Sequence, residues 1–168
     1  MSDTYHNLAS GSLTQNWGTN QITGNDDWSG VPSIQGFLGD ISAATTNDVD
    51  PRTLTGEALG AIDVISNQSN PNTNGTGGVA EFDGIANPTV ALQGSGTADA
   101  PALVIYLNTI GRENVRVQFN ARDIDGSADN AAQQLNVQYR IGNTGAWTNV
   151  ADAYFADVTT GGSATPVT

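Results

Sequence analysis

Apolar and polar residues alternate along several stretches of this chain, and this period of two most limits its fold. Every second residue is apolar in "NVRVQFNARD" (114–123) and again in "QLNVQYRI" (134–141). Such a period is typical of strands with one face toward a core and the other toward water. The stretch "PALVIYLNT" (101–109) is more continuously apolar, as expected near the middle of a sheet. No segment has a helical stripe of useful length.

Weaker strand patterns fill much of the remaining sequence, at 33–38, 58–65, 79–83, 89–93 and 146–157. Clusters of glycine, asparagine, aspartate and proline separate them, as turns do. Many short strands joined in this way indicate one antiparallel β-sandwich of jelly-roll type, formed by residues 11–168. The predicted core is made of inward-facing strand residues: Val115, Val117, Phe119, Leu135, Val137, Tyr139, Leu103, Ile105 and Leu107.

The charge of the chain restricts its partners. Seventeen acidic residues against five arginines give a formal charge of −12, and there is no lysine. A surface this negative repels phosphate backbones, which argues against nucleic-acid binding, and no hydrophobic run is long enough to insert into a membrane. The absence of cysteine excludes disulfides and thiolate zinc sites. Fourteen of the acids are aspartate, which is a frequent calcium ligand. This composition suits a protein of the extracellular medium, where calcium is present.

The stretch "RDIDGSADN" (122–130) gathers oxygen-bearing side chains directly after a predicted strand. They are Asp123, Asp125, Ser127, Asp129 and Asn130. Calcium takes roughly six to eight oxygen ligands, and alternate residues of an irregular loop can turn oxygens toward one centre. The stretch lacks the glycine and glutamate positions of an EF-hand loop. It predicts a Ca²⁺ site, with a solvated turn and acid–base chemistry as the alternatives.

A second acidic group, Asn25, Asp26 and Asp27, lies in "GNDDWSGVPSI" (24–34). We expect these side chains to be further contributors to the calcium site. Trp28 follows directly, and its indole has two interpretations: a core residue, or a surface ring that stacks on a sugar. The core interpretation is favoured, and Trp28 is kept as the candidate for ligand binding.

Few residues suit catalysis. The one histidine, His6, lies in a polar N-terminal segment (1–10) that we predict to be flexible. With His6 in that segment and no second histidine, cysteine or lysine, the sequence does not support a Ser–His–Asp triad or a Ser–Lys dyad. Paired carboxylates can hydrolyse glycosides, but among 17 acids such pairs arise by chance. The sequence therefore predicts a chain that is not an enzyme.

The runs "GNDDWSGVPSI", "VALQGSGTADAP" and "RDIDGSADNA" carry a family resemblance, within the longer stretches 13–40, 70–109 and 115–150. They resemble a module of large secreted bacterial proteins, found beside extracellular endonuclease/exonuclease/phosphatase-type, lamin-tail and RTX-like segments. The resemblance implies an accessory β-sandwich without its own active site, secreted or on the cell surface. The neighbouring domains make a hydrolase of nuclease or phosphatase type the competing class, and a carbohydrate-binding module with a glycan ligand is a further alternative.

The resemblance also concerns the C-terminal end. Relatives continue past "TPVT" (165–168) with a further strand that this sequence lacks. A sandwich without that strand exposes unpaired backbone groups and apolar surface. We expect a complementing peptide, or the C-terminal strand of the parent protein, to fill the position by β-strand addition. The alternative is that residues 158–168 fold back and close the sheet. The sequence thus predicts a non-catalytic, calcium-stabilised module, structural or ligand-binding, of a larger exported protein.

Overall fold

The computed structural model describes residues 4–18, 21–41, 49–54, 61–73, 76–124, 132–158 and 165–167. The chain is all-β, with 32% of residues in strands and 6% in short helical turns, so the predicted fold class is confirmed. Its several small sheets are consistent with a β-sandwich-like fold, while the jelly-roll order of strands stays a prediction. The chain divides into two compact units, the N-terminal unit Met1–Glu113 and the C-terminal unit Asn114–Thr168.

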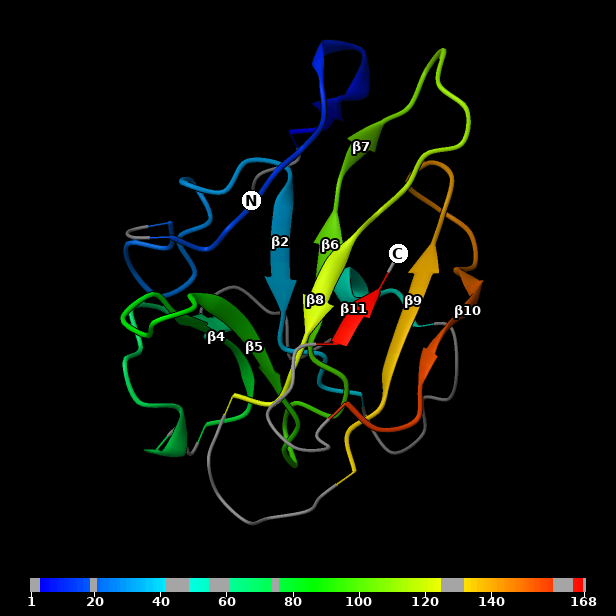
Figure 1. The fold of residues 1–168 in the computed structure, drawn as a ribbon. Helices are drawn as coiled ribbons and strands as arrows, with labels where there is room; N and C mark the ends of the chain where they lie inside the picture. Colours follow the sequence, from blue (N-terminus) through cyan, green and yellow to red (C-terminus); the bar gives the residue numbers. More distant parts are fainter. Residues whose placement is uncertain are drawn as a thin grey trace. The chain divides into compact units, whose positions relative to one another are not determined.

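A three-stranded sheet forms one part of the N-terminal unit (Figure 1). It consists of β3 (Val64–Ile65), β4 (Gly78–Phe82) and β5 (Thr89–Gln93), with β3 parallel and β5 antiparallel to the central β4. Every residue of β4 is buried, so both faces of this central strand are covered. The alternation of the sequence predicted β5 with the same limits and β4 to within one residue.

Two strand pairs also lie in the described part of the N-terminal unit. β2 (Ile34–Phe37) runs antiparallel to β6 (Ala102–Ile105), and β1 (His6–Asn7) runs parallel to β7 (Leu107–Asn108). The predicted strand 101–109 is thus divided between β6 and β7. The pair His6–Asn7 belongs to the segment predicted to be flexible, but in the structure it forms β1. Short 3-10 turns lie at η1 (Leu8–Ser10), η2 (Pro51–Thr53) and η4 (Pro71–Thr73).

The hydrophobic core of the N-terminal unit draws half of its buried cluster from outside the strands. The cluster consists of Ile22, Trp28, Val31, Ile34, Val64 and Val79. The first three lie in the irregular segment before β2. Strand periodicity does not detect such residues, because an irregular backbone has no fixed alternation of faces.

The C-terminal unit is built from two antiparallel pairs (Figure 1). β8 (Phe119–Ala121) pairs with β11 (Thr165–Val167), and β9 (Leu135–Tyr139) pairs with β10 (Thr148–Phe155). Among the described residues, the strands on either side of the acidic stretch, β8 and β9, do not pair with each other, and each pairs with a different strand.

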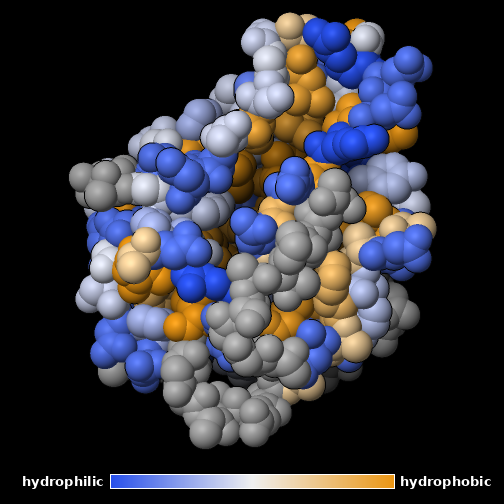
Figure 2. Space-filling model, viewed as in Figure 1, coloured by the Kyte–Doolittle hydropathy of each residue, from blue (hydrophilic) through white to orange (hydrophobic). Residues whose placement is uncertain are grey.

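Part of the predicted core is exposed. Val115 and Val117 each retain 42% of their accessible surface, and Ile105 and Tyr139 retain 41% and 51%. The prediction was wrong for these four residues because alternation tells which side chains share a face, whereas burial also needs a second layer over that face. The other predicted core residues are partly buried: Phe119, Leu135, Val137, Leu103 and Leu107. Apolar side chains accordingly reach the surface of the molecule (Figure 2).

The described part of the chain contains no helix of the length and apolar character that crossing a membrane requires.

Candidate functional site

The second acidic group is bonded to the backbone of β3. Asp26 has a left-handed backbone, with φ of 60°. Its Oδ1 accepts the N–H of Asp63 at 2.7 Å and that of Val64 at 3.0 Å, and its own N–H donates to the Val64 carbonyl at 3.2 Å. The Oδ1 of Asn25 accepts the N–H of Ser66 at 3.2 Å. These bonds fasten the turn to a strand far along the chain, so both side chains have a structural role.

Asp27, the third member of this group, closes its own turn. Its carboxylate accepts the Thr23 hydroxyl at 2.8 Å and the N–H of Ser29 at 3.1 Å. Hydrogen bonds from the Ser29 and Thr23 side chains, followed by the Ser29 backbone, hold the pKa of Asp27 below its ordinary value. The carboxylate is therefore stabilised by neutral donors of its own turn.

Trp28 is a core residue. Only 6% of it is exposed, and it belongs to the same buried cluster as Ile22 and Val79. A Cβ placed on Gly36 would lie 2.5 Å from Cζ2 of Trp28, so the indole packs against the backbone of β2. The core interpretation of Trp28 is confirmed, and its ring is not at the surface to stack on a sugar.

A buried carboxylate that the sequence pattern did not indicate lies in β4, one residue before the strand ends. Glu81 has no exposed surface, and both of its oxygens lie 3.3 Å from the backbone nitrogen of Ile22. The N–H of Asn67 also donates to it. Burial is the largest influence on its pKa, and together with the charge of Asp83 it outweighs these hydrogen bonds and raises the pKa. The one sequence signal is a charged residue inside the apolar strand "VAEFD" (79–83).

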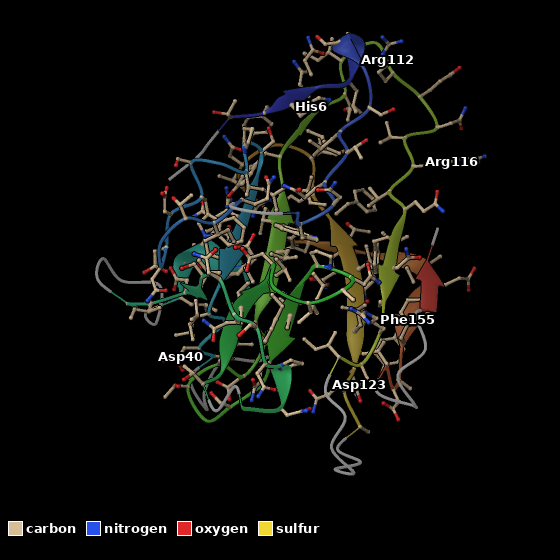
Figure 3. All side chains as sticks on the ribbon, turned by 60° about the vertical axis from the view of Figure 1, so that its left-hand side comes forward. His6, Asp40, Arg112, Arg116, Asp123 and Phe155 are labelled. Atoms are coloured by element: carbon tan, nitrogen blue, oxygen red, sulfur yellow. The ribbon has the colours of Figure 1, made fainter. Side chains whose placement is uncertain are left out.

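The predicted calcium loop begins directly after β8. Asp123 is partly buried and lies two residues beyond Ala121, the last residue of that strand (Figure 3). The other predicted ligands, Asp125, Ser127, Asp129 and Asn130, lie outside the described residues. Among the residues that the structure describes, no three His, Cys, Asp or Glu side chains are grouped so as to hold a metal ion. The calcium site therefore stays a prediction.

One face of the β9–β10 ribbon carries three amides, which we call the amide row: Asn136, Gln138 and Asn149. Asn136 and Gln138 share a side of β9 because side chains alternate along a strand. Asn149 of β10 lies directly opposite Gln138. Its Oδ1 accepts hydrogen bonds from Nδ2 of Asn136 and Nε2 of Gln138, each at 2.9 Å. Sequence alternation places the two β9 residues on one face, but only the register between the strands adds the third.

Aromatic rings flank the amide row. Arg140 continues the alternation of β9, and its guanidinium carbon lies 4.5 Å from the centre of the Trp147 ring. At the other end Tyr154 lies opposite Asn136, and cross-strand partners share a face. If the register at the start of β10 continued regularly, Ala151 would stand there. A bulge in β10 puts Tyr154 in that place instead.

Two further polar contacts belong to the N-terminal unit. The Nε2 of His6 lies 2.9 Å from the carbonyl oxygen of Gly11, next to β1 (Figure 3). Arg52 forms an ion pair with Asp50 at 2.9 Å. Burial opposes the charge of Arg52, but the hydrogen bond and charge of Asp50, with smaller contributions from Tyr106, outweigh it and raise the pKa of Arg52. Both contacts stabilise local structure, and the sequence analysis assigned a catalytic role to neither.

Comparison of the chain with protein-family models, with curated proteins and with solved structures gave no match.

Proposed function

We propose that the chain is a non-catalytic module of a larger exported bacterial protein, structural or ligand-binding, that calcium stabilises. The observation that carries this proposal is the use of acidic and amide side chains in the N-terminal unit. Asn25, Asp26 and Glu81 accept backbone N–H groups from segments distant in the sequence. Side chains used in this way hold loops in place, so their role is structural, as in a non-catalytic module.

The calcium part of the proposal rests on the loop after β8. Asp123 is positioned by the end of a strand, and Asp125, Ser127, Asp129 and Asn130 follow within the same short stretch. Carboxylates this close in sequence repel one another unless a cation lies between them. We propose that Ca²⁺ is that cation, and that Asn25, Asp26 and Asp27 serve the fold of the N-terminal unit rather than this site.

Direct titration tests this proposal. Isothermal titration of the chelator-treated chain with Ca²⁺ is expected to show saturable binding that the double variant Asp125→Asn, Asp129→Asn loses. Asp99→Asn is the matched control, since Asp99 is an exposed aspartate in a turn of the N-terminal unit. Equal binding by the double variant and the wild type would show that calcium does not bind to this loop.

The same preparation separates a module from a hydrolase. We expect no turnover of DNA, RNA, p-nitrophenyl phosphate or polysaccharides above the buffer rate, with Ca²⁺ or Mg²⁺ present. Turnover that a single Asp→Asn or Glu→Gln change abolishes would instead support the nuclease or phosphatase class.

A complementing strand also has a specific place in this proposal. The ladder between β8 and β11 pairs Thr165 with Ala121 and Val167 with Phe119. Residues 165–167 thus lie beside β8. In an antiparallel register, a strand that extends this ladder lies beside residues 115–118. Val115 and Val117 are exposed there, which favours strand addition by a partner or by the parent protein at this segment.

A synthetic peptide tests strand addition. A seven-residue peptide of alternating valine and threonine is expected to raise the Tm of the chain, and Val117→Pro is expected to abolish the increase because proline removes a ladder donor. The control is Val150→Pro, a comparably exposed valine on β10. An unchanged Tm with the wild-type chain would show that the segment does not accept a strand.

A further inference from the structure

The amide row and the rings beside it form a surface with the chemistry of a sugar-binding platform. Asn136 and Asn149 are exposed, Gln138 is partly buried, and Tyr154 keeps 54% of its surface. Sugar rings present apolar C–H faces and a rim of hydroxyl groups that both donate and accept hydrogen bonds. Aromatic rings suit such faces, and amides, which also donate and accept, suit such rims.

The hydrogen bonds within the amide row determine what it can offer a ligand. The Oδ1 of Asn149 already accepts two bonds, from Asn136 and Gln138. These bonds leave the Nδ2 of Asn149 as a donor and the amide oxygens of Asn136 and Gln138 as acceptors toward a ligand. Mutual bonding also restricts the rotamers of the three side chains, which lowers the entropy lost on binding.

The bulge in β10 places a second aromatic residue, Tyr154, at the end of the amide row formed by Asn136. It replaces Ala151 by Tyr154 opposite Asn136, while Trp147 lies against Arg140 at the other end. From Asn136 to Arg140 a strand extends by about 13 Å, which exceeds the size of one sugar ring. The platform is therefore long enough for consecutive units of a polysaccharide.

Charge decides between neutral and acidic glycans. The five platform residues are uncharged, and beside them the guanidinium of Arg140 lies over Trp147 and also donates to the carbonyl of Gly145 at 3.4 Å. The whole chain carries −12, so a polyanion meets long-range repulsion on approach. We propose that the face of β9–β10 formed by Asn136, Gln138, Asn149, Trp147 and Tyr154 binds a neutral polysaccharide. This inference rests on the proposed function, in which the module binds its ligand without converting it.

Affinity electrophoresis of the full chain tests the inference. The probes are laminarin, galactomannan and xylan as neutral polysaccharides, with polygalacturonate and single-stranded DNA as polyanions. At least one neutral probe is expected to retard the chain in native gels. Tyr154→Ala, Trp147→Ala and Asn149→Ala are each expected to weaken that binding about tenfold.

Tyr139→Ala is the matched control for Tyr154→Ala. Both tyrosines belong to the same ribbon and are about equally exposed, at 51% and 54%, but Tyr139 belongs to the opposite set of alternating β9 residues. Binding by Tyr139→Ala is expected to stay within about twofold of wild type. Because Tyr154 is exposed, its replacement leaves folding intact, which a far-UV circular dichroism spectrum checks for every variant.

Each outcome decides the inference. Retardation by no neutral probe, retardation by polyanions alone, or equal losses in Tyr139→Ala and Tyr154→Ala would overturn it while leaving the proposed non-catalytic module in place. Release of reducing ends from a bound polysaccharide would overturn the proposed function and keep the binding face. Binding without turnover, lost in the three platform variants, supports both.

Discussion

Both carboxylate oxygens of Glu81 lie 3.3 Å from the backbone nitrogen of Ile22, a residue 59 positions earlier in the chain. The contact joins the buried strand β4 to the irregular segment that supplies Ile22 to the core. A fully buried carboxylate is costly to ionise, since water that would solvate the charge is excluded. Backbone N–H groups that donate to the Glu81 carboxylate offset part of this cost.

The pH dependence of stability is expected to report on Glu81. Its pKa is raised in the folded state, chiefly by burial, so the folded chain binds the proton more tightly than the unfolded chain. The resulting stability is fully present below the ordinary glutamate pKa of about 4.3 and is lost as pH rises through the raised folded value. The free energy of unfolding should therefore fall as pH rises above the ordinary glutamate range and through the raised pKa of Glu81, and Glu81→Gln should flatten that slope.

Urea unfolding at a series of pH values measures this slope. Glu113→Gln is the control because Glu113 is an exposed glutamate of the same unit. Asp27 contributes a pH dependence of the opposite sign. Its pKa is lowered in the folded state, so the stability it provides is lost only as pH falls through and below the ordinary aspartate range. Parallel curves for wild type and Glu81→Gln would contradict the role given to Glu81.

Asp26→Ala is expected to destabilise the chain by about 1–3 kcal/mol. It removes the acceptor for the N–H groups of Asp63 and Val64, and it places alanine at a positive φ that asparagine tolerates better. Asp26→Asn, which keeps an Oδ1 that can accept both N–H groups, should lose much less. Urea unfolding of both variants beside Asp99→Ala checks this, and a neutral Asp26→Ala would show that the turn does not depend on its side chain.

Gly36→Ala is expected to disturb the core through Trp28. The new Cβ would lie 2.5 Å from Cζ2 of the indole, so the ring must move or β2 must shift, at a cost of about 1–3 kcal/mol. A loss of the near-UV circular dichroism of tryptophan should accompany the lower stability. Gly96→Ala is the control because a Cβ there meets nothing within 4 Å. Equal stabilities of the two variants would refute the close packing.

Calcium is expected to raise the free energy of unfolding by about 2.7 kcal/mol at a hundredfold excess over its Kd, provided it binds only the folded form. Melting with added Ca²⁺ and with EGTA measures the difference. Asp125→Ala should melt at one temperature in both buffers, near that of the wild type in EGTA. A wild-type Tm that EGTA leaves unchanged would assign "RDIDGSADN" to an ordinary turn.

The all-β class and most strand positions could be predicted from residue patterns along the chain. Period-two patterning predicted β5 and β9 closely, because alternation follows from the geometry of a single strand and needs no knowledge of its partners. The same pattern placed Asn136 and Gln138 on one face. It did not reveal burial, and Val115, Val117, Ile105 and Tyr139, predicted to lie in the core, are exposed.

Contacts between residues far apart in the chain could not be predicted in this way and emerged from the folded structure. The bond between Asp26 and β3, the burial of Glu81 and the position of Tyr154 opposite Asn136 each depend on a loop path or a strand register. Local sequence specifies backbone preference over a few residues, whereas register is set by the packing of the whole unit and by irregularities such as the bulge in β10. That difference is why the strands were predictable while the buried acid and the platform on β9–β10 were not.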